Sequence, residues 1–178
     1  MYNLKCRFSS LSIGLIVLLG LGATSPAADA PSVAFLGVHF QNDNESLEPT
    51  SDGERERLER TGEEFTQQLA SSGRFEIVPT TGAMQAKIAS GQPMGECGGC
   101  EIDYGRGLGV DFVAWIRVQK VSNLILNMNV YIADVSSGRT VLTKSVDLRG
   151  NTDEGWSRSL KYLVKNLLPT ANIKPSGQ

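Results

Sequence analysis

Apolar residues recur along the chain with two different periods, which predict strands and helices in alternation. Residues 33–40 (VAFLGVHF) form a nearly continuous apolar run, typical of a strand that is buried on both faces. Residues 74–78 predict a short strand in which Phe75 and Ile77 share one side. Three further strands are predicted at residues 111–121, 123–135 and 139–149.

Helix signals separate these apolar runs. Ser51 and Glu54 have the spacing of a capping box, so a helix is expected to begin there and to end near Gly73. The charged residues 52–64 are interpreted as its solvated face. Two shorter helices are predicted at residues 81–89 and 100–108, and in the second Gly105 and Gly107 each weaken the helix by roughly 1 kcal/mol relative to Ala.

A final helix is predicted from residue 152, where a polar cap and two acidic residues precede an apolar stripe. The stripe consists of Trp156, Leu160, Leu163, Val164, Leu167 and Leu168. Pro169 ends this helix.

The last two strands are joined by a tight turn at residues 136–138, and this turn fixes their register. Centred on Ser137, it pairs Ile132 with Leu142 and leaves the apolar residues of both strands on one face. An odd-length connection near residue 122 aligns the preceding strand with the same face. The opposite face then carries polar side chains, namely Arg117, Gln119, Asn127, Asn129, Asp147 and Arg149.

The element order predicts an α/β (α+β) fold built on a mixed sheet of about five strands. A parallel βαβ unit with a right-handed crossover comes first, a three-strand antiparallel meander follows, and helices pack on the sheet. We expect one domain over residues 31–169 and a flexible tail over residues 170–178.

The first thirty residues have the pattern of a secretory signal peptide. Lys5 and Arg7 precede the uncharged apolar residues 11–23, and residues 28–30 (ADA) supply the small side chains of a cleavage site. The apolar run is shorter than the roughly 20 residues that span a bilayer. We therefore expect export to the oxidising periplasm as a soluble protein, without stable membrane insertion.

Removal of this leader leaves 148 residues with 15 basic and 18 acidic side chains, a net charge of −3. Weak acidity argues against nucleic acid or an anionic membrane as the main partner. His39 is the one histidine, which leaves little room for histidine-based catalysis or a histidine-rich metal site.

Three segments carry a resemblance to a known family: the cysteine-containing loop before Glu101, residues 119–127 (QKVSNLILN) and residues 147–156 (DLRGNTDEGW). Over residues 33–168 the chain resembles an uncharacterised family of periplasmic bacterial proteins, a domain of unknown function. This resemblance implies no established activity. Members of the family are expected to be encoded near the genes of periplasmic quinoprotein dehydrogenases.

A more distant resemblance rests on residues 72–75 (SGRF), 108–111 (LGVD) and 134–138 (DVSSG). In these segments the chain is similar to the amino-terminal domain of TolB and to curli-secretion and LpoB-type envelope proteins. The similarity implies an α/β fold that is used for protein contacts rather than for catalysis.

Cys97 and Cys100 form the one motif with reactive side chains, at the start of a predicted helix. Two alternatives remain open: a structural disulfide that closes a glycine-rich loop, or a redox-active pair whose thiolate the helix would stabilise. Glu101 stands where haem attachment would need histidine, and zinc would need two further ligands. No metal and no cofactor is therefore expected.

The polar strand face is the second candidate site. It is either a surface for a partner protein or ligand, or the ordinary solvated face of an antiparallel sheet, where Asp147 and Arg149 would pair. Trp115 and Tyr131 share this face, either as an aromatic contact patch or beneath a helix. The leading hypothesis is a non-enzymatic periplasmic accessory or protein-interaction module; the alternative is a thiol-disulfide accessory protein that uses Cys97 and Cys100, serving for example a quinoprotein dehydrogenase.

Overall fold

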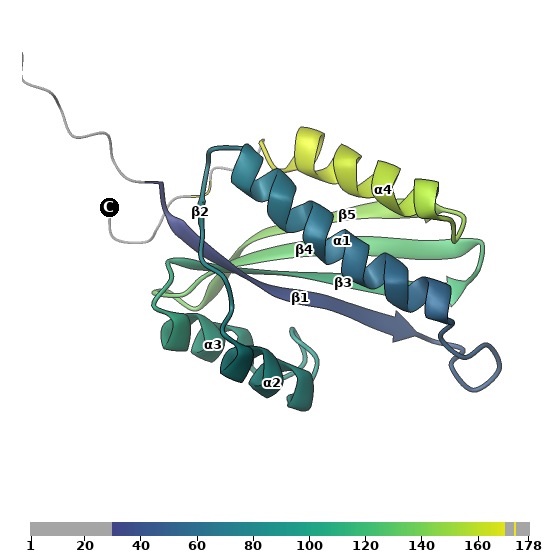
Figure 1. The fold of residues 1–178 in the computed structure, drawn as a ribbon, viewed down its shortest axis with the longest axis horizontal. Helices are drawn as coiled ribbons and strands as arrows, with labels where there is room; N and C mark the ends of the chain where they lie inside the picture. The colour runs from purple at the N-terminus through teal and green to yellow at the C-terminus, as the bar shows by residue number, and fades with distance from the viewer. Residues whose placement is uncertain (1–29, 170–172, 174–178) are drawn as a thin grey trace, which may run out of the picture.

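The computed structural model of the protein describes residues 30–169 and residue 173. A five-stranded sheet with the order β2-β1-β3-β4-β5 lies between helices (Figure 1). The strands are β1 (Ser32–Asn42), β2 (Glu76–Ile77), β3 (Phe112–Ser122), β4 (Ile125–Asp134) and β5 (Arg139–Arg149). The helices are α1 (Asp52–Ser71), α2 (Gly82–Ser90), α3 (Cys100–Leu108) and α4 (Asp153–Tyr162), with a π-helical turn η1 (Leu163–Leu167).

The predicted fold class is confirmed. β1 runs parallel to both β2 and β3, whereas β3, β4 and β5 form an antiparallel meander. Ile132 faces Leu142 in the observed register, as the turn chemistry predicts. Met128 likewise faces Val146, so the apolar residues of the meander share one face of the sheet.

Each face of the sheet has its own core. Phe65 of α1 and Trp156 of α4 pack with Ile116 and Met128 on one face. On the other face, Ile102 of α3 packs in a smaller cluster that includes Trp115. Because β1 is covered on both sides, its nearly continuous apolar sequence fits the prediction of a doubly buried strand.

Two elements differ from their predicted extent. The short strand expected at residues 74–78 is reduced to β2, because it pairs only with Ser32 and Val33 of β1 before the chain turns away at Pro79. The final helix changes to a π-helical turn at Leu163, which allows Leu163, Val164 and Leu168 all to remain buried.

The ends of the chain lie largely beyond the described residues. Residues 1–29 of the predicted leader are outside them, as is the predicted tail except Ile173, whose side chain lies in the core formed with α1 and α4. Within the described part of the chain, no helix is both long and apolar enough to cross a membrane.

Candidate interaction face and disulfide loop

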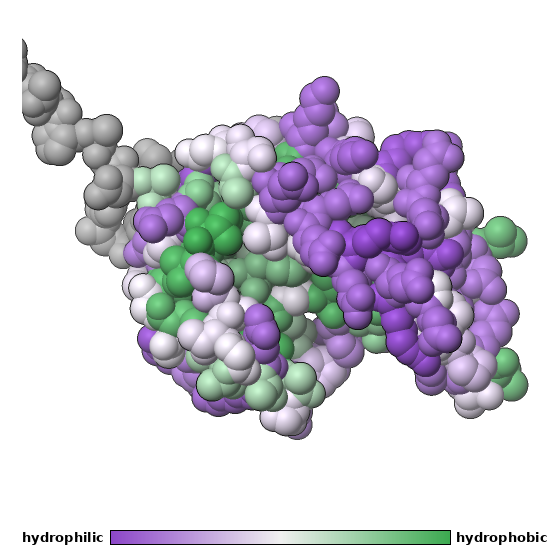
Figure 2. Space-filling view, in the orientation of Figure 1, coloured by the Kyte–Doolittle hydropathy of each residue, from purple (hydrophilic) through white to green (hydrophobic). Residues whose placement is uncertain are grey.

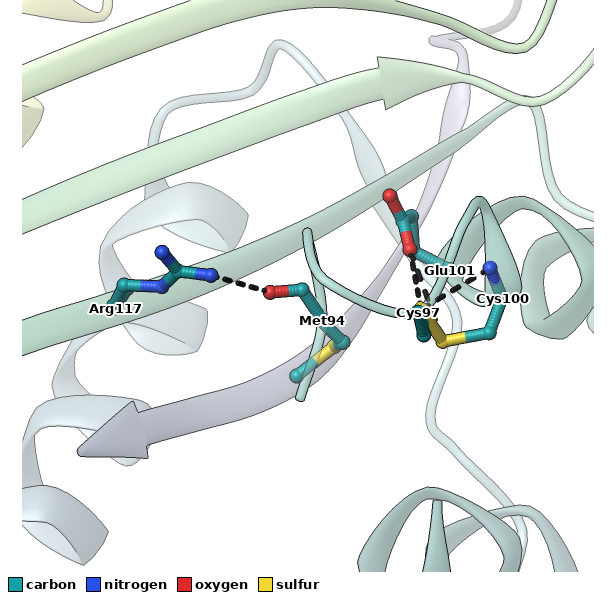
Figure 3. Close-up of a disulfide and its surroundings, with 5 residues drawn as sticks. All are labelled: Met94, Cys97, Cys100, Glu101 and Arg117. Atoms are coloured by element: carbon teal, nitrogen blue, oxygen red, sulfur yellow. Dashed lines mark hydrogen bonds between the residues drawn. A yellow bond between two sulfur atoms is a disulfide. The ribbon is translucent and has the colours of Figure 1, made fainter. Parts of the chain in front are cut away.

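A disulfide joins Cys97 and Cys100 at the start of α3 (Figure 3). Both cysteines are half-buried, and Gly98 and Gly99 between them have positive φ angles that only glycine adopts readily. The backbone N–H of Cys100 donates to the sulfur of Cys97 over 3.2 Å. The glycines of the predicted loop are therefore what allows so tight a closure.

Glu101 is the residue of this loop whose role the sequence did not reveal. One of its carboxylate oxygens lies 3.0 Å from Sγ of Cys97 and 3.8 Å from Sγ of Cys100. A carboxylate this close opposes a thiolate, because it raises the free energy of a second negative charge. The sequence does place Glu101 directly after the second cysteine, and this adjacency is the feature from which the contact could have been predicted.

The same three side chains are the group in the described chain that could gather round a metal ion, since their ligand atoms lie within 4.8 Å of one another. In the disulfide, however, neither sulfur is a thiolate, which is the form that binds metals. A structural zinc site also uses four protein ligands. The donor set of the oxidised loop therefore does not fit a metal.

Arg117 ties the disulfide loop to the sheet. Its guanidinium donates to the carbonyl oxygen of Met94 over 3.1 Å (Figure 3). It also forms an ion pair with Glu96 at 3.0 Å. His39 lies beside Arg117 on the neighbouring strand. Burial, and secondarily the positive charge of Arg117, lowers the pKa of His39, so the imidazole is neutral at neutral pH.

The loop and α3 cover one half of the predicted polar face. Trp115 is buried in the cluster that includes Ile102, and its ring stacks on Tyr131 with centroids 5.1 Å apart. The sequence left open whether these aromatic residues form a contact patch or lie beneath a helix, and in the structure they are covered by α3 and the loop. Arg117, a predicted member of the partner surface, is directed into the loop instead of outward.

The remaining predicted residues form the half that we call the open face: Gln119, Asn127, Asn129, Asp147 and Arg149. The first three are half-buried, and the last two are exposed. Asn127 donates to Asp147 over 3.2 Å and accepts from Ser145 over 3.0 Å. Asp147 takes Asn127 as its partner, and no ion pair between Asp147 and Arg149 occurs among the described residues.

Exposed aliphatic residues lie where the open face ends and in the adjoining loop after β1, and we call them the apolar tip: Leu47, Val121, Leu124 and Ile125. Leu47 and Leu124 are each 82% exposed. Ile125 lies opposite Arg149 in the register, so the tip continues directly from the open face. Figure 2 shows apolar side chains projecting at this end of the molecule, beyond the end of β1.

Backbone and side-chain hydrogen bonds fix the two loops that form the tip. The backbone N–H of Asp43 donates to the carbonyl of Lys120 over 3.0 Å, and Asn123 donates to Glu48 over 3.2 Å. Leu47 and Leu124 are thus exposed on anchored loops. Sequence periodicity missed the tip because Leu47 and Leu124 belong to loops, while Val121 and Ile125 lie at the adjoining ends of two different strands, β3 and β4.

A buried ion pair that includes Lys120, the neighbour of Val121 in β3, is a second feature that the sequence did not reveal. Nζ of Lys120 lies 2.8 Å from a carboxylate oxygen of Glu54, and both side chains are at most 3% exposed. The expectation that residues 52–64 form a solvated face is therefore wrong at Glu54 and at Thr61, which are buried. Glu54 also accepts from Asn151, which in turn accepts from the indole N–H of Trp156.

This network holds Glu54 ionised. Burial alone would raise its pKa, but Lys120 and the hydrogen bonds from Ser51 and Asn151 lower the pKa to about 2. The capping-box role of Glu54 is confirmed, because its carboxylate accepts from the backbone N–H of Ser51. Glu54 therefore helps to cap the start of α1 and also connects this helix to Lys120 of β3 and to Asn151 just before α4.

The profile of the family described as "Protein of unknown function (DUF2380)" matches residues 31–168. The chain belongs to this family. The match confirms the predicted family resemblance and covers every strand and helix described above. A comparison with proteins of curated function found no match.

Solved structures of low sequence identity are similar to the chain. The LpoB C-terminal domain from Salmonella enterica is 14% identical with a TM-score of 0.49, covering 70% of this chain and 86% of that one. Lipoprotein GNA1162 from Neisseria meningitidis is 14% identical with a TM-score of 0.49, covering 80% and 99%. TolB from Acinetobacter baumannii is 17% identical with a TM-score of 0.40, covering 77% of this chain but 28% of TolB.

Proposed function

We propose that the protein is an exported, non-enzymatic accessory module that binds another periplasmic or envelope protein through the apolar tip and the open face. The observation that carries the proposal is the tip, where exposed aliphatic side chains sit on anchored loops beside polar groups. Exposed aliphatic side chains beside polar groups are found at protein interaction sites.

Export is supported by two independent features. The predicted leader ends one residue before Pro31, and β1 begins at Ser32, so cleavage would remove no part of the sheet. The disulfide between Cys97 and Cys100 suits an oxidising compartment, where such bonds persist. The proposed location is the periplasm.

The alternative, a thiol-disulfide accessory protein, has weaker support. The helix start at Cys100 favours a thiolate, but the carboxylate of Glu101 lies 3.0 Å from the sulfur of Cys97 and opposes it. Arg117 also fastens the loop to β3, as a structural role requires. We therefore propose that the disulfide stabilises the loop that covers Trp115.

The proposal is tested by affinity capture from periplasmic extract of the native host, with Leu124→Asp as the variant. A charge at this exposed position leaves the fold intact and adds a desolvation cost to binding, so the partner is expected to be lost. Val141→Asp, on an exposed residue near the other end of β5, is the matched control and retains the partner. Equal capture by both variants would contradict the proposed surface.

A further inference from the structure

Most of one edge of β1 has no strand beside it. β1 pairs with β3 from Val33 to Asn42, but on its other side it pairs with β2 only at Ser32 and Val33. Among residues 30–169 and 173, no strand continues the sheet along this side beyond Val33. Such an edge presents backbone donors and acceptors that another extended chain can use.

The hydrogen bonds to β2 show which peptide groups face this edge. The carbonyls of Pro31 and Val33 accept from Glu76 and Val78, at 3.0 and 2.9 Å, so alternate residues from Pro31 point away from β3. The bulge around Gly37, whose φ is 122°, shifts this alternation by one residue. Phe35, Val38 and Phe40 consequently direct their N–H and C=O groups to the open edge.

Two hollows flank this edge and meet at Gly37 and Val38. The first, of about 1020 Å³, lies against α1, and its lining includes Phe35 and Leu58. The second, of about 320 Å³, lies against α2, and its lining includes Ile88 and Met94. Figure 2 shows the surface hollowed between the lobe that contains α2 and α3 and the body of the molecule. An added strand would therefore have room for side chains on both of its faces.

The charges that line the hollows indicate which kind of segment could bind at this edge. Glu59 and Glu63 line the hollow on the α1 side, and no Lys or Arg belongs to the described lining of either hollow. A second copy paired at this edge would bring the same glutamates together, which is unfavourable. A segment with basic side chains facing α1 and aliphatic side chains facing α2 would complement both walls.

We propose that the open edge of β1 receives an extended, basic segment of a partner protein as an additional strand. Main-chain hydrogen bonds to Phe35, Val38 and Phe40 supply affinity, and alternate side chains in the two hollows supply specificity. This proposal goes beyond the proposed function, because the edge and the apolar tip involve different residues. A Leu124→Asp variant that loses its captured partner but still binds at the edge would separate the two.

The test uses the mature chain and the peptide Lys-Val-Lys-Val-Lys-Val-Lys with blocked ends. Saturable binding is expected, with slowed amide hydrogen exchange at Phe35, Val38 and Phe40. The variant Glu59→Lys with Glu63→Lys weakens binding by about tenfold or more, since it reverses both wall charges. The control Glu76→Lys with Glu154→Lys makes the same change of net charge outside both hollows and binds within about twofold of the original.

Two further peptides separate strand addition from simple charge attraction. Methylation of alternate backbone nitrogens removes the donors of a strand and abolishes binding, and replacement of every Lys by Glu does the same. The proposal is overturned by absence of binding, by equal binding of the methylated peptide, or by unchanged exchange at the three amides. It is equally overturned if the chain itself dimerises through this edge in sedimentation experiments.

Discussion

Glu54 and Lys120 show at the scale of single residues how a charge can become part of the core. The pair is stable because each ion is the partner of the other and because Ser51 and Asn151 satisfy the remaining lone pairs of the carboxylate. Removal of Glu54 leaves the buried Lys120 with the exposed Glu48, 3.6 Å away, as its remaining ion-pair partner among the described residues. Glu54→Gln is therefore expected to lower the free energy of unfolding by about 3–5 kcal/mol in urea denaturation.

The dependence of the free energy of unfolding on pH provides a second test of this ion pair. The pKa of Glu54 is about 2 in the folded protein against an ordinary value of 4.5, so the carboxylate stabilises the fold above pH 4.5. That contribution falls as the pH drops from 4.5 toward 2, and the difference between the original chain and Glu54→Gln should shrink over this interval. Glu48→Gln is the control, since Glu48 is exposed and 3.6 Å from Lys120, and it should cost less than about 1 kcal/mol. A difference that does not vary with pH would contradict the assignment.

At the scale of elements, the disulfide loop and α3 act as a cover for half of the sheet face. The loop closed by Cys97 and Cys100 is short, so Cys97→Ser with Cys100→Ser should lower the free energy of unfolding by only about 2 kcal/mol and leave partner capture unchanged.

Glu101→Gln removes the negative charge beside the disulfide and should speed reduction of the disulfide by dithiothreitol by roughly tenfold. Asp103→Asn, on the exposed side of the same helix, is the control. A reduction rate that Glu101→Gln leaves unchanged would remove the electrostatic argument against redox chemistry.

Element order, hairpin register and helix starts could be predicted from the sequence because they depend on local signals. The capping residues Ser51 and Thr81 and the turn at residues 136–138 are such signals. Long-range contacts could not be predicted in this way. Gly105 illustrates the difference: the sequence presents it as a helix weakness, whereas a Cβ there would lie 2.5 Å from Val135 and 2.7 Å from Val113. Glycine at this position allows α3 to approach the sheet.

The candidate site could be predicted only in part for the same reason. Alternation along the strands placed Asn127 and Asp147 on one face, and the structure keeps them there. It could not show that the loop around Cys97 folds over the Trp115 half of that face, since this depends on Arg117 reaching Met94 and Glu96. The apolar tip depends on two loops that meet in space, and periodicity carries no information about such a meeting.

At the scale of the whole molecule, the two helix layers leave one end of the sheet accessible. α1 and α4 cover one face, α3 and the disulfide loop cover half of the other, and the open face continues into the apolar tip (Figure 1). The buried Glu54–Lys120 pair lies close to this end, since Lys120 directly precedes Val121 of the tip in β3. The central claim is that a partner protein docks at this end.

Site-specific photocrosslinking in cells of the native host tests this claim most directly. A photoreactive residue at Leu124 or Asn127 should give one crosslinked species of defined mass, whereas the same residue at Asp103 on α3 or Lys161 on α4 should not. All four positions are at least partly exposed, so they differ in location rather than in access. Crosslinks of equal yield from all four positions, or none from Leu124 and Asn127, would contradict docking at the apolar tip and open face.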